Sequence, residues 1–161
     1  MMMNTEYVYE RDRAEFSLGD TLDIKAGLIL ACLTFLAIQA GELLRQPLNQ
    51  YQIIAQGISI MSLILGGFLS VAVLWPYKYY REATPDKYDS WIKQMEAYRA
   101  NHPEATAVED ALTGARLLSA KQRILLNGSI NKRKSTLMFA AFGATVISFM
   151  ANILTLARHL F

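Results

Sequence analysis

Residues that build catalytic or metal centres are scarce in this chain. Its 161 residues include one cysteine, Cys32, and two histidines, His102 and His159. A single cysteine excludes an intrachain disulfide, and a metal site would need partner ligands that are absent around it. No glycine-rich phosphate loop, carboxylate pair or nucleophile–base set stands out. We therefore expect a protein that is not an enzyme and that carries neither a metal nor a tightly bound cofactor.

Charged residues are missing from three long stretches, which cover residues 26–41, 51–77 and 135–157. The apolar core of a bilayer is about 30 Å thick, and about 20 helical residues cross it. The second and third stretches reach this length alone, and the first does so if it continues past Glu42 to Leu44. The sequence predicts an all-α membrane protein with three transmembrane helices over about 22–44, 51–77 and 135–158.

A strong net charge is also lacking, because 16 Lys and Arg oppose 14 Asp and Glu. The formal net charge of +2 is too small to suggest binding to nucleic acid. Eleven of the 16 basic residues lie between Lys78 and Lys134. The positive-inside rule then places the N-terminus and residues 78–134 in the cytoplasm, with the 45–50 link and the C-terminus outside.

Two sequence signals divide the chain into segments. The stretch "SLGD" at 17–20 is typical of a helix start with Ser17 as its cap. We therefore expect residues 1–16 to form a separate cytoplasmic segment and residues 17–161 a single domain. In "TPDKYDSW", Thr84 and Pro85 indicate a further helix start. From about Glu104 no proline follows, so one long helix is predicted to continue into the membrane, and residues 85–134 form a cytoplasmic helical hairpin.

Small and polar residues predict which faces of the three helices meet, since packing in a membrane depends on close approach and hydrogen bonds. The predicted contact faces are Asp23, Gly27, Ala31, Thr34 and Gly41; Ser59, Ser62, Gly66 and Ser70; and Ala140, Ala144, Ser148 and Asn152. At the head of the first face, we expect Asp23 to pair with Arg133 or Lys134. Lys25 points to another side, toward lipid headgroups or a ligand.

A second polar set lies toward the outer leaflet and comprises Gln39, Glu42, Gln56, Asn152 and Thr155. Such residues face either the interior of a helix bundle or a water-filled path. Two interpretations stay open: the lining of a gated path, or interhelical hydrogen bonds that fix the register. The second is favoured, because no ionisable residue lies at mid-membrane.

Two stretches resemble a known family. The segment "DIKAGLILA" is similar to the first membrane helix of the Pycsar-type transmembrane effectors of bacterial anti-phage defence. The segment "NGSINKRKSTLMFAA", with Asn127, Ile130 and Lys134, is similar to that family's second signature. The layout of two spans, a basic helical segment and a final span also matches. Gly128 and Ser135 stand near positions where the family often has an arginine and an aromatic residue.

The resemblance implies an oligomeric effector in the bacterial inner membrane that disrupts the membrane during abortive infection. A cyclic nucleotide made by a partner cyclase would activate or restrain it. The family-motif polar cluster is Asp23, Lys25, Asn127 and Lys134. Candidate nucleotide-binding cations are Lys25, Lys121, Arg123, Lys132, Arg133 and Lys134, with Tyr79, Tyr80 or Trp91 to stack a base. The alternative is a non-catalytic membrane subunit that anchors a cytoplasmic partner.

Overall fold

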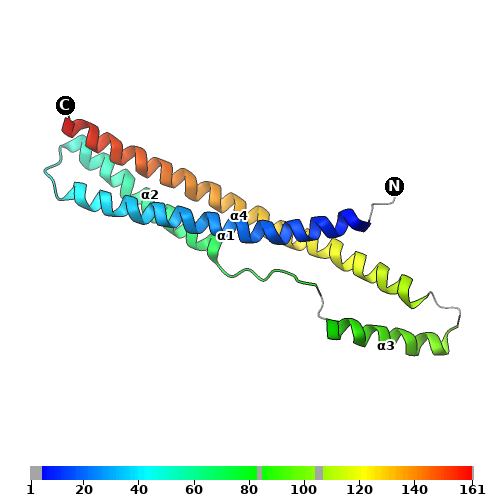
Figure 1. Ribbon diagram of the computed structural model, residues 1–161. Coiled ribbons are helices and arrows are strands. Elements are labelled where there is room, and N and C mark those ends of the chain that lie inside the picture. Colours follow the sequence, from blue (N-terminus) through cyan, green and yellow to red (C-terminus); the bar gives the residue numbers. More distant parts are fainter. Residues whose placement is uncertain (1–4, 83–84, 104–106, 161) are drawn as a thin grey trace. The chain divides into compact units, whose positions relative to one another are not determined.

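The computed structural model is all-helical and describes residues 5–82, 85–103 and 107–160 (Figure 1). Its helices are α1 (Thr5–Leu44), α2 (Gln50–Leu74), α3 (Pro85–Asn101) and α4 (Val108–Leu160). Three of them, α1, α2 and α4, are long and apolar enough to cross a membrane. The predicted fold class is confirmed, and the three apolar helices indicate a membrane location.

The chain forms two compact units. Unit 1 comprises Met1–Ser17 and Lys78–Ile130, and unit 2 comprises Leu18–Tyr77 and Asn131–Phe161. Helices α1 and α4 are each divided between the two units, with one part of the helix in each unit. The N-terminal segment thus groups with the segment that follows α2.

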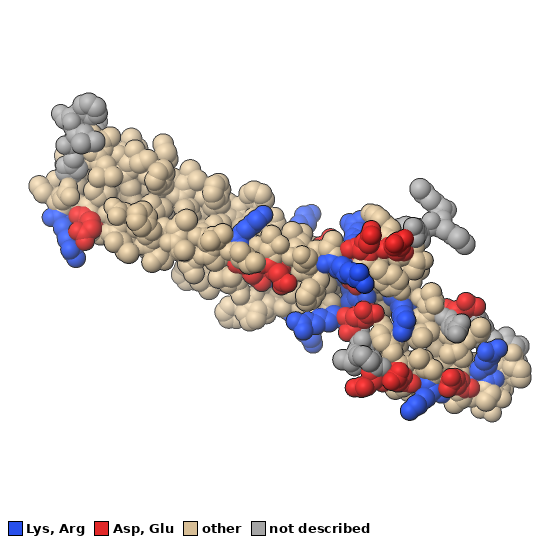
Figure 2. Space-filling model, in the orientation of Figure 1, with Lys and Arg blue, Asp and Glu red and all other residues tan. Residues whose placement is uncertain are grey.

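In unit 2, α2 lies beside the later parts of α1 and α4 (Figure 1). Asn49 caps α2, because its side chain accepts hydrogen bonds from the N–H groups of Tyr51 and Gln52. The helix ends at Leu74, three residues before the predicted end. Pro76 explains this difference, because a residue before proline avoids the helical conformation, and Trp75 has a non-helical ψ of 135°. Figure 2 shows that charged side chains are sparse over this apolar part of the visible surface.

The predicted start of the first helix at Ser17 is wrong, because α1 begins at Thr5 and Ser17 lies inside it. The stretch "ERDRAEF" contains good helix formers and needs no cap at Ser17. Tertiary packing also supports this part of α1: Val8 is fully buried, and Asp12 forms an ion pair with Arg123. Contacts within unit 1 thus extend the helix by more than three turns.

The predicted contact face of α1 is also wrong, because Gly27, Ala31, Thr34 and Gly41 are exposed. The buried face consists instead of Leu22, Ala26, Leu33, Leu36, Ala40 and Leu43. The faces predicted for the other two spans are largely confirmed: Ser59, Gly66, Ser70, Ala144, Ser148 and Asn152 are buried, while Ser62 is half-buried and Ala140 exposed. Small residues on two helices leave space at the centre, and α1 fills it with leucines, as close packing requires.

Gly66 marks the tightest of these contacts and gives a testable prediction. A Cβ atom at this position would lie 3.1 Å from Leu33 Cδ2 and 3.3 Å from Ala144 Cβ. We expect Gly66→Leu to lower the free energy of unfolding by about 2 kcal/mol, since overpacking costs roughly 1–3 kcal/mol. The measurement is SDS-driven unfolding in mixed micelles, followed by tryptophan fluorescence.

The neighbouring residue supplies the control for this substitution. A Cβ atom at Gly67 meets nothing within 4 Å. Gly67→Leu should therefore unfold at the same SDS fraction as the parent protein or at a higher one, because leucine is the better helix former. Equal losses in both variants would contradict the proposed role of Gly66 as the contact between three helices.

In unit 1, α3 and the first part of α4 form the predicted hairpin. Helix α3 begins at Pro85 as expected, whereas Thr84 and Glu104 lie outside the described residues. The Arg116 guanidinium lies over the Tyr88 ring, 4.4 Å from its centroid, and Trp91 meets the same ring edge-on. An open groove of about 710 Å³ between the two arms is lined mainly by Ile92, Val108 and Leu112, with Glu96 and Arg99 among the polar residues.

Candidate functional site

The two stretches that carry the family resemblance meet in unit 2. Lys134 Nζ donates to Asp23 Oδ1 at 2.6 Å, so the predicted pairing is confirmed for Lys134. The Lys134 side chain is 2% exposed and the Asp23 side chain 40%. The Tyr77 ring lies against the same ammonium group, with its centroid 5.3 Å from Lys134 Nζ. A carboxylate and an aromatic face thus compensate a lysine that is buried where the apolar part of α4 begins.

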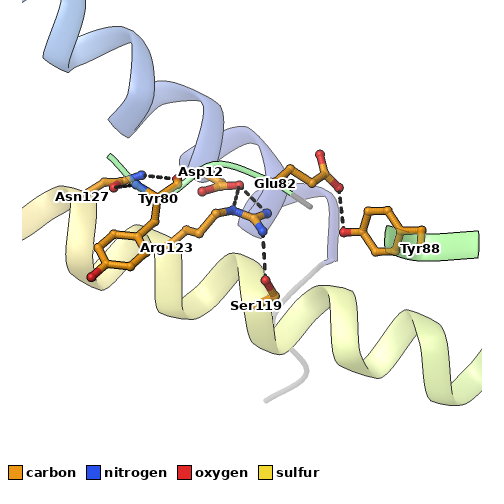
Figure 3. Close-up of polar contacts among 7 residues, drawn as sticks. All are labelled: Asp12, Tyr80, Glu82, Tyr88, Ser119, Arg123 and Asn127. Atoms are coloured by element: carbon orange, nitrogen blue, oxygen red, sulfur yellow. Dashed lines mark hydrogen bonds and ion pairs between the residues drawn. The ribbon is translucent and has the colours of Figure 1, made fainter. Parts of the chain in front are cut away.

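A second buried ion pair lies in unit 1 (Figure 3). Arg123 Nε and Nη2 both donate to Asp12 Oδ2, at 2.9 and 2.7 Å, and Nη1 donates to Ser119 Oγ at 3.0 Å. The side chains of Arg123 and Asp12 are only 6% and 17% exposed. This pair holds the N-terminal part of α1 against α4 and leaves the guanidinium well supplied with acceptors.

Asn127 holds the non-helical segment that follows α2 (Figure 3). Its Oδ1 accepts from the backbone N–H of Tyr80 at 3.0 Å, and its Nδ2 donates to the carbonyl of the same residue at 3.1 Å. A segment without helical hydrogen bonds needs such partners for its backbone groups. Asn127 therefore has a structural role, because its side-chain amide pairs with both the backbone N–H and the backbone carbonyl of Tyr80.

Tyr88 extends the polar cluster of unit 1. Its hydroxyl donates to Glu82 Oε1 at 3.2 Å (Figure 3). Burial raises the pKa of Tyr88 above its ordinary value, and the nearby negative charge of Glu82 raises it further. The phenol thus stays protonated at physiological pH and keeps its role as a donor.

The six predicted nucleotide-binding cations fall into two groups. Arg123 and Lys134 are buried and bonded to carboxylates, whereas Lys25, Lys121, Lys132 and Arg133 are exposed. Of the aromatic side chains expected to stack a base, Tyr79 packs edge-on against Phe16, and Trp91 packs against Tyr88. The four exposed cations remain available for an anionic ligand.

The predicted outer polar set separates into buried and exposed members. Gln56 Nε2 donates to Asn152 Oδ1 at 3.2 Å and to Thr155 Oγ1 at 2.9 Å. In contrast, Gln39 is exposed, and Glu42 is exposed and pairs with Arg45 at 3.2 Å. These contacts agree with the interpretation that Gln56 and Asn152 fix the helix register.

Asn152 links all three helices of unit 2. Its Oδ1 also accepts from Ser59 Oγ at 3.0 Å, and its Nδ2 donates to the carbonyl of Leu36 at 3.5 Å. Asn152→Ala should lower the free energy of unfolding by about 1–2 kcal/mol, the scale of buried hydrogen bonds in membranes. The same SDS titration measures it. Gln39→Leu, at an exposed position, serves as the control and should leave the free energy of unfolding unchanged.

Sequence reasoning missed several residues of these clusters. Asp12 lies in a segment that was expected to be separate, and nothing local to "ERDRAEF" indicates a buried partner on α4. Ser59 and Ser148 were expected at helix contacts, but their mutual hydrogen bond of 2.8 Å was not. The spacing of Ser59 from Gln56, one helical turn, is the signal that could have placed both in the polar set.

Among the described residues, no group of three or more His, Cys, Asp or Glu side chains could hold a metal ion. No family model, curated protein or solved structure matches this chain.

Proposed function

We propose that this protein is a non-enzymatic effector of the bacterial inner membrane that assembles into oligomers and disrupts the membrane under the control of a nucleotide second messenger. The observation that carries the proposal is the Asp23–Lys134 ion pair, which joins the two stretches that resemble the Pycsar-type effectors. Three apolar helices provide the membrane location on which the activity depends.

Nucleotide control requires two states that differ in ligand affinity. The ion pair supports such a pair of states, because Lys134 is buried and its charge needs an anionic partner. An arrangement that separates the two side chains must supply another anion to Lys134, and a phosphate group has the required chemistry.

Membrane disruption in this proposal requires several copies. Among the described residues, leucine, serine and glutamine side chains are buried where the three helices of unit 2 meet, so an aqueous path would need more than one copy. The proposed orientation follows the positive-inside rule: the N-terminus and residues 78–134 in the cytoplasm, the C-terminus outside. In this orientation the four exposed cations face the compartment in which a cyclase releases its product.

The test is to express the chain in bacteria with an active or an inactivated nucleotide cyclase and to record the membrane potential with a voltage-sensitive dye. We expect the potential to depend on cyclase activity, by depolarisation if the nucleotide activates and by protection if it restrains. Asp23→Asn should abolish this dependence, while Glu10→Gln, at an exposed position of α1, should retain it. A potential that no cyclic or linear nucleotide alters would refute the effector function.

The groove of unit 1 favours a second candidate function, the anchoring of a cytoplasmic partner. Ile92, Val108 and Leu112 line it together with Glu96 and Arg99, so it could receive an apolar side chain of another protein. Under this alternative the chain co-purifies with a stoichiometric partner, is not toxic, and loses the partner in Leu112→Asp. A toxic, nucleotide-dependent chain without such a partner would exclude it.

A further inference from the structure

Five charged residues of unit 2 lie at one level of the helix bundle: Asp23, Lys25, Lys132, Arg133 and Lys134. The 2.6 Å contact between Lys134 and Asp23 places these two residues of α4 and α1 side by side. Lys25 lies two residues from Asp23, and Lys132 and Arg133 lie within two residues of Lys134. At 1.5 Å of rise per residue, these cations lie within about 3 Å of the ion pair along their helices.

The segment after α2 reaches the same level. The Tyr77 ring lies 5.3 Å from Lys134 Nζ and 5.9 Å from Arg133 Cζ, measured to its centroid. Two residues earlier, Trp75 is 64% exposed. An exposed tryptophan at the end of an apolar helix is typical of the interface between membrane and water.

The charge at this level is positive. Asp23 and Lys134 compensate each other, whereas Lys25, Lys132 and Arg133 are exposed. Asp20, also exposed, lies one helical turn farther from the apolar part of α1. At the other end of α1, Glu42 and Arg45 form a pair with no net charge.

The apolar surface begins next to these cations. Residues 26–41 of α1 and 135–157 of α4 carry no charge. The 23 residues of the second stretch extend about 35 Å as a helix, enough for the hydrocarbon core of a bilayer. The exposed cations therefore lie where the phosphate groups of phospholipids border the hydrocarbon core.

We infer that Lys25, Lys132 and Arg133 form a site that binds the headgroup phosphates of anionic phospholipids. Trp75 lies in the same interfacial layer. A phospholipid places its phosphate on the cations while its acyl chains cover the adjacent apolar surface. A free nucleotide offers the same ionic contact but has no acyl chains to cover the adjacent apolar surface of the helices, so the lipid is the better ligand for this site. The inference rests on the membrane location and not on the effector function.

The experiment uses Trp75 as a local reporter. In Trp91→Phe protein, Trp75 is the only tryptophan of the chain. This protein is reconstituted into phosphatidylcholine vesicles that contain phosphatidylglycerol, with one or the other lipid brominated, and the quenching of Trp75 gives their relative binding constants. We expect phosphatidylglycerol to be preferred about fivefold, the contribution of one Lys or Arg near an anionic surface.

Charge variants test the residues. Lys25→Gln/Lys132→Gln/Arg133→Gln should reduce the preference to about one, and the double variant Lys132→Gln/Arg133→Gln should lower it partway. Lys25→Arg/Lys132→Arg, which keeps the charges, should retain it, as should Lys121→Gln at an exposed position of unit 1. Circular dichroism and size-exclusion chromatography check the fold of each variant.

Three results would overturn the proposed lipid site. The first is an equal affinity of the surroundings of Trp75 for both lipids. The second is a preference for phosphatidylglycerol that survives loss of all three cations. The third is displacement of phosphatidylglycerol by millimolar cyclic or linear nucleotide monophosphate, which would assign the cations to a free phosphate ligand. None of these results decides whether a cyclase alters the membrane potential, so the two proposals fail separately.

Discussion

Asp12→Ala should loosen the contact of the N-terminal part of α1 with the rest of unit 1. The substitution leaves the Arg123 guanidinium, 6% exposed, with Ser119 as its only remaining side-chain partner in Figure 3. Removal of one member of a buried ion pair costs about 3–5 kcal/mol, because the other charge stays buried without the carboxylate to which it was hydrogen-bonded. Hydrogen exchange at the amides around Val8 should accelerate by about two to four orders of magnitude, since each 1.4 kcal/mol is tenfold.

Two further variants separate this ion pair from general effects of charge. Glu10→Gln removes a carboxylate from the same turn of α1 at an exposed position, and exchange should change by less than about twofold. Adding Arg123→Met to Asp12→Ala removes the uncompensated charge and should restore part of the protection. Unchanged exchange in Asp12→Ala would mean that other contacts of unit 1 hold this helix.

Asp23→Asn should lower the free energy of unfolding of unit 2 by about 2–3 kcal/mol. This loss is smaller than that for a fully buried ion pair, because the Asp23 side chain is 40% exposed. Lys134 is 2% exposed and loses its anionic partner, while the new amide keeps much of the shape of the carboxylate. SDS-driven unfolding followed by the fluorescence of Trp75, near this end of the bundle, measures the loss.

The matched variants for Asp23 are Lys25→Gln and Lys134→Met. Lys25 is exposed, so its replacement should leave the unfolding midpoint nearly unchanged. Lys134→Met in the Asp23→Asn background removes the uncompensated charge from the apolar surroundings and should recover stability. If Asp23→Asn unfolds like the parent protein, the ion pair does not stabilise unit 2, and its proposed role as a two-state element is lost as well.

Local sequence properties determined the membrane-spanning parts of this protein. Residues 51–77 and 135–157 lack charge over lengths that a bilayer requires, and proline positions placed the end of α2 and the start of α3 within a few residues. The pairing of Asp23 with Lys134 was also predictable, because two charges at the mouths of two apolar helices need each other. These features depend on composition and on positions close in sequence.

Only the tertiary structure decided the start of α1, its buried face and the partner of Arg123. Gly27 and Ala31 form a plausible contact face by themselves, but Gly66 and Ala144 already supply the small residues, and Leu33 fills the space they leave. In the same way, Asp12 extends α1 through a residue 111 positions away, which no local pattern reveals. Hydropathy and helix propensity act over a few turns, whereas close packing and the compensation of buried charge depend on whatever the fold brings alongside.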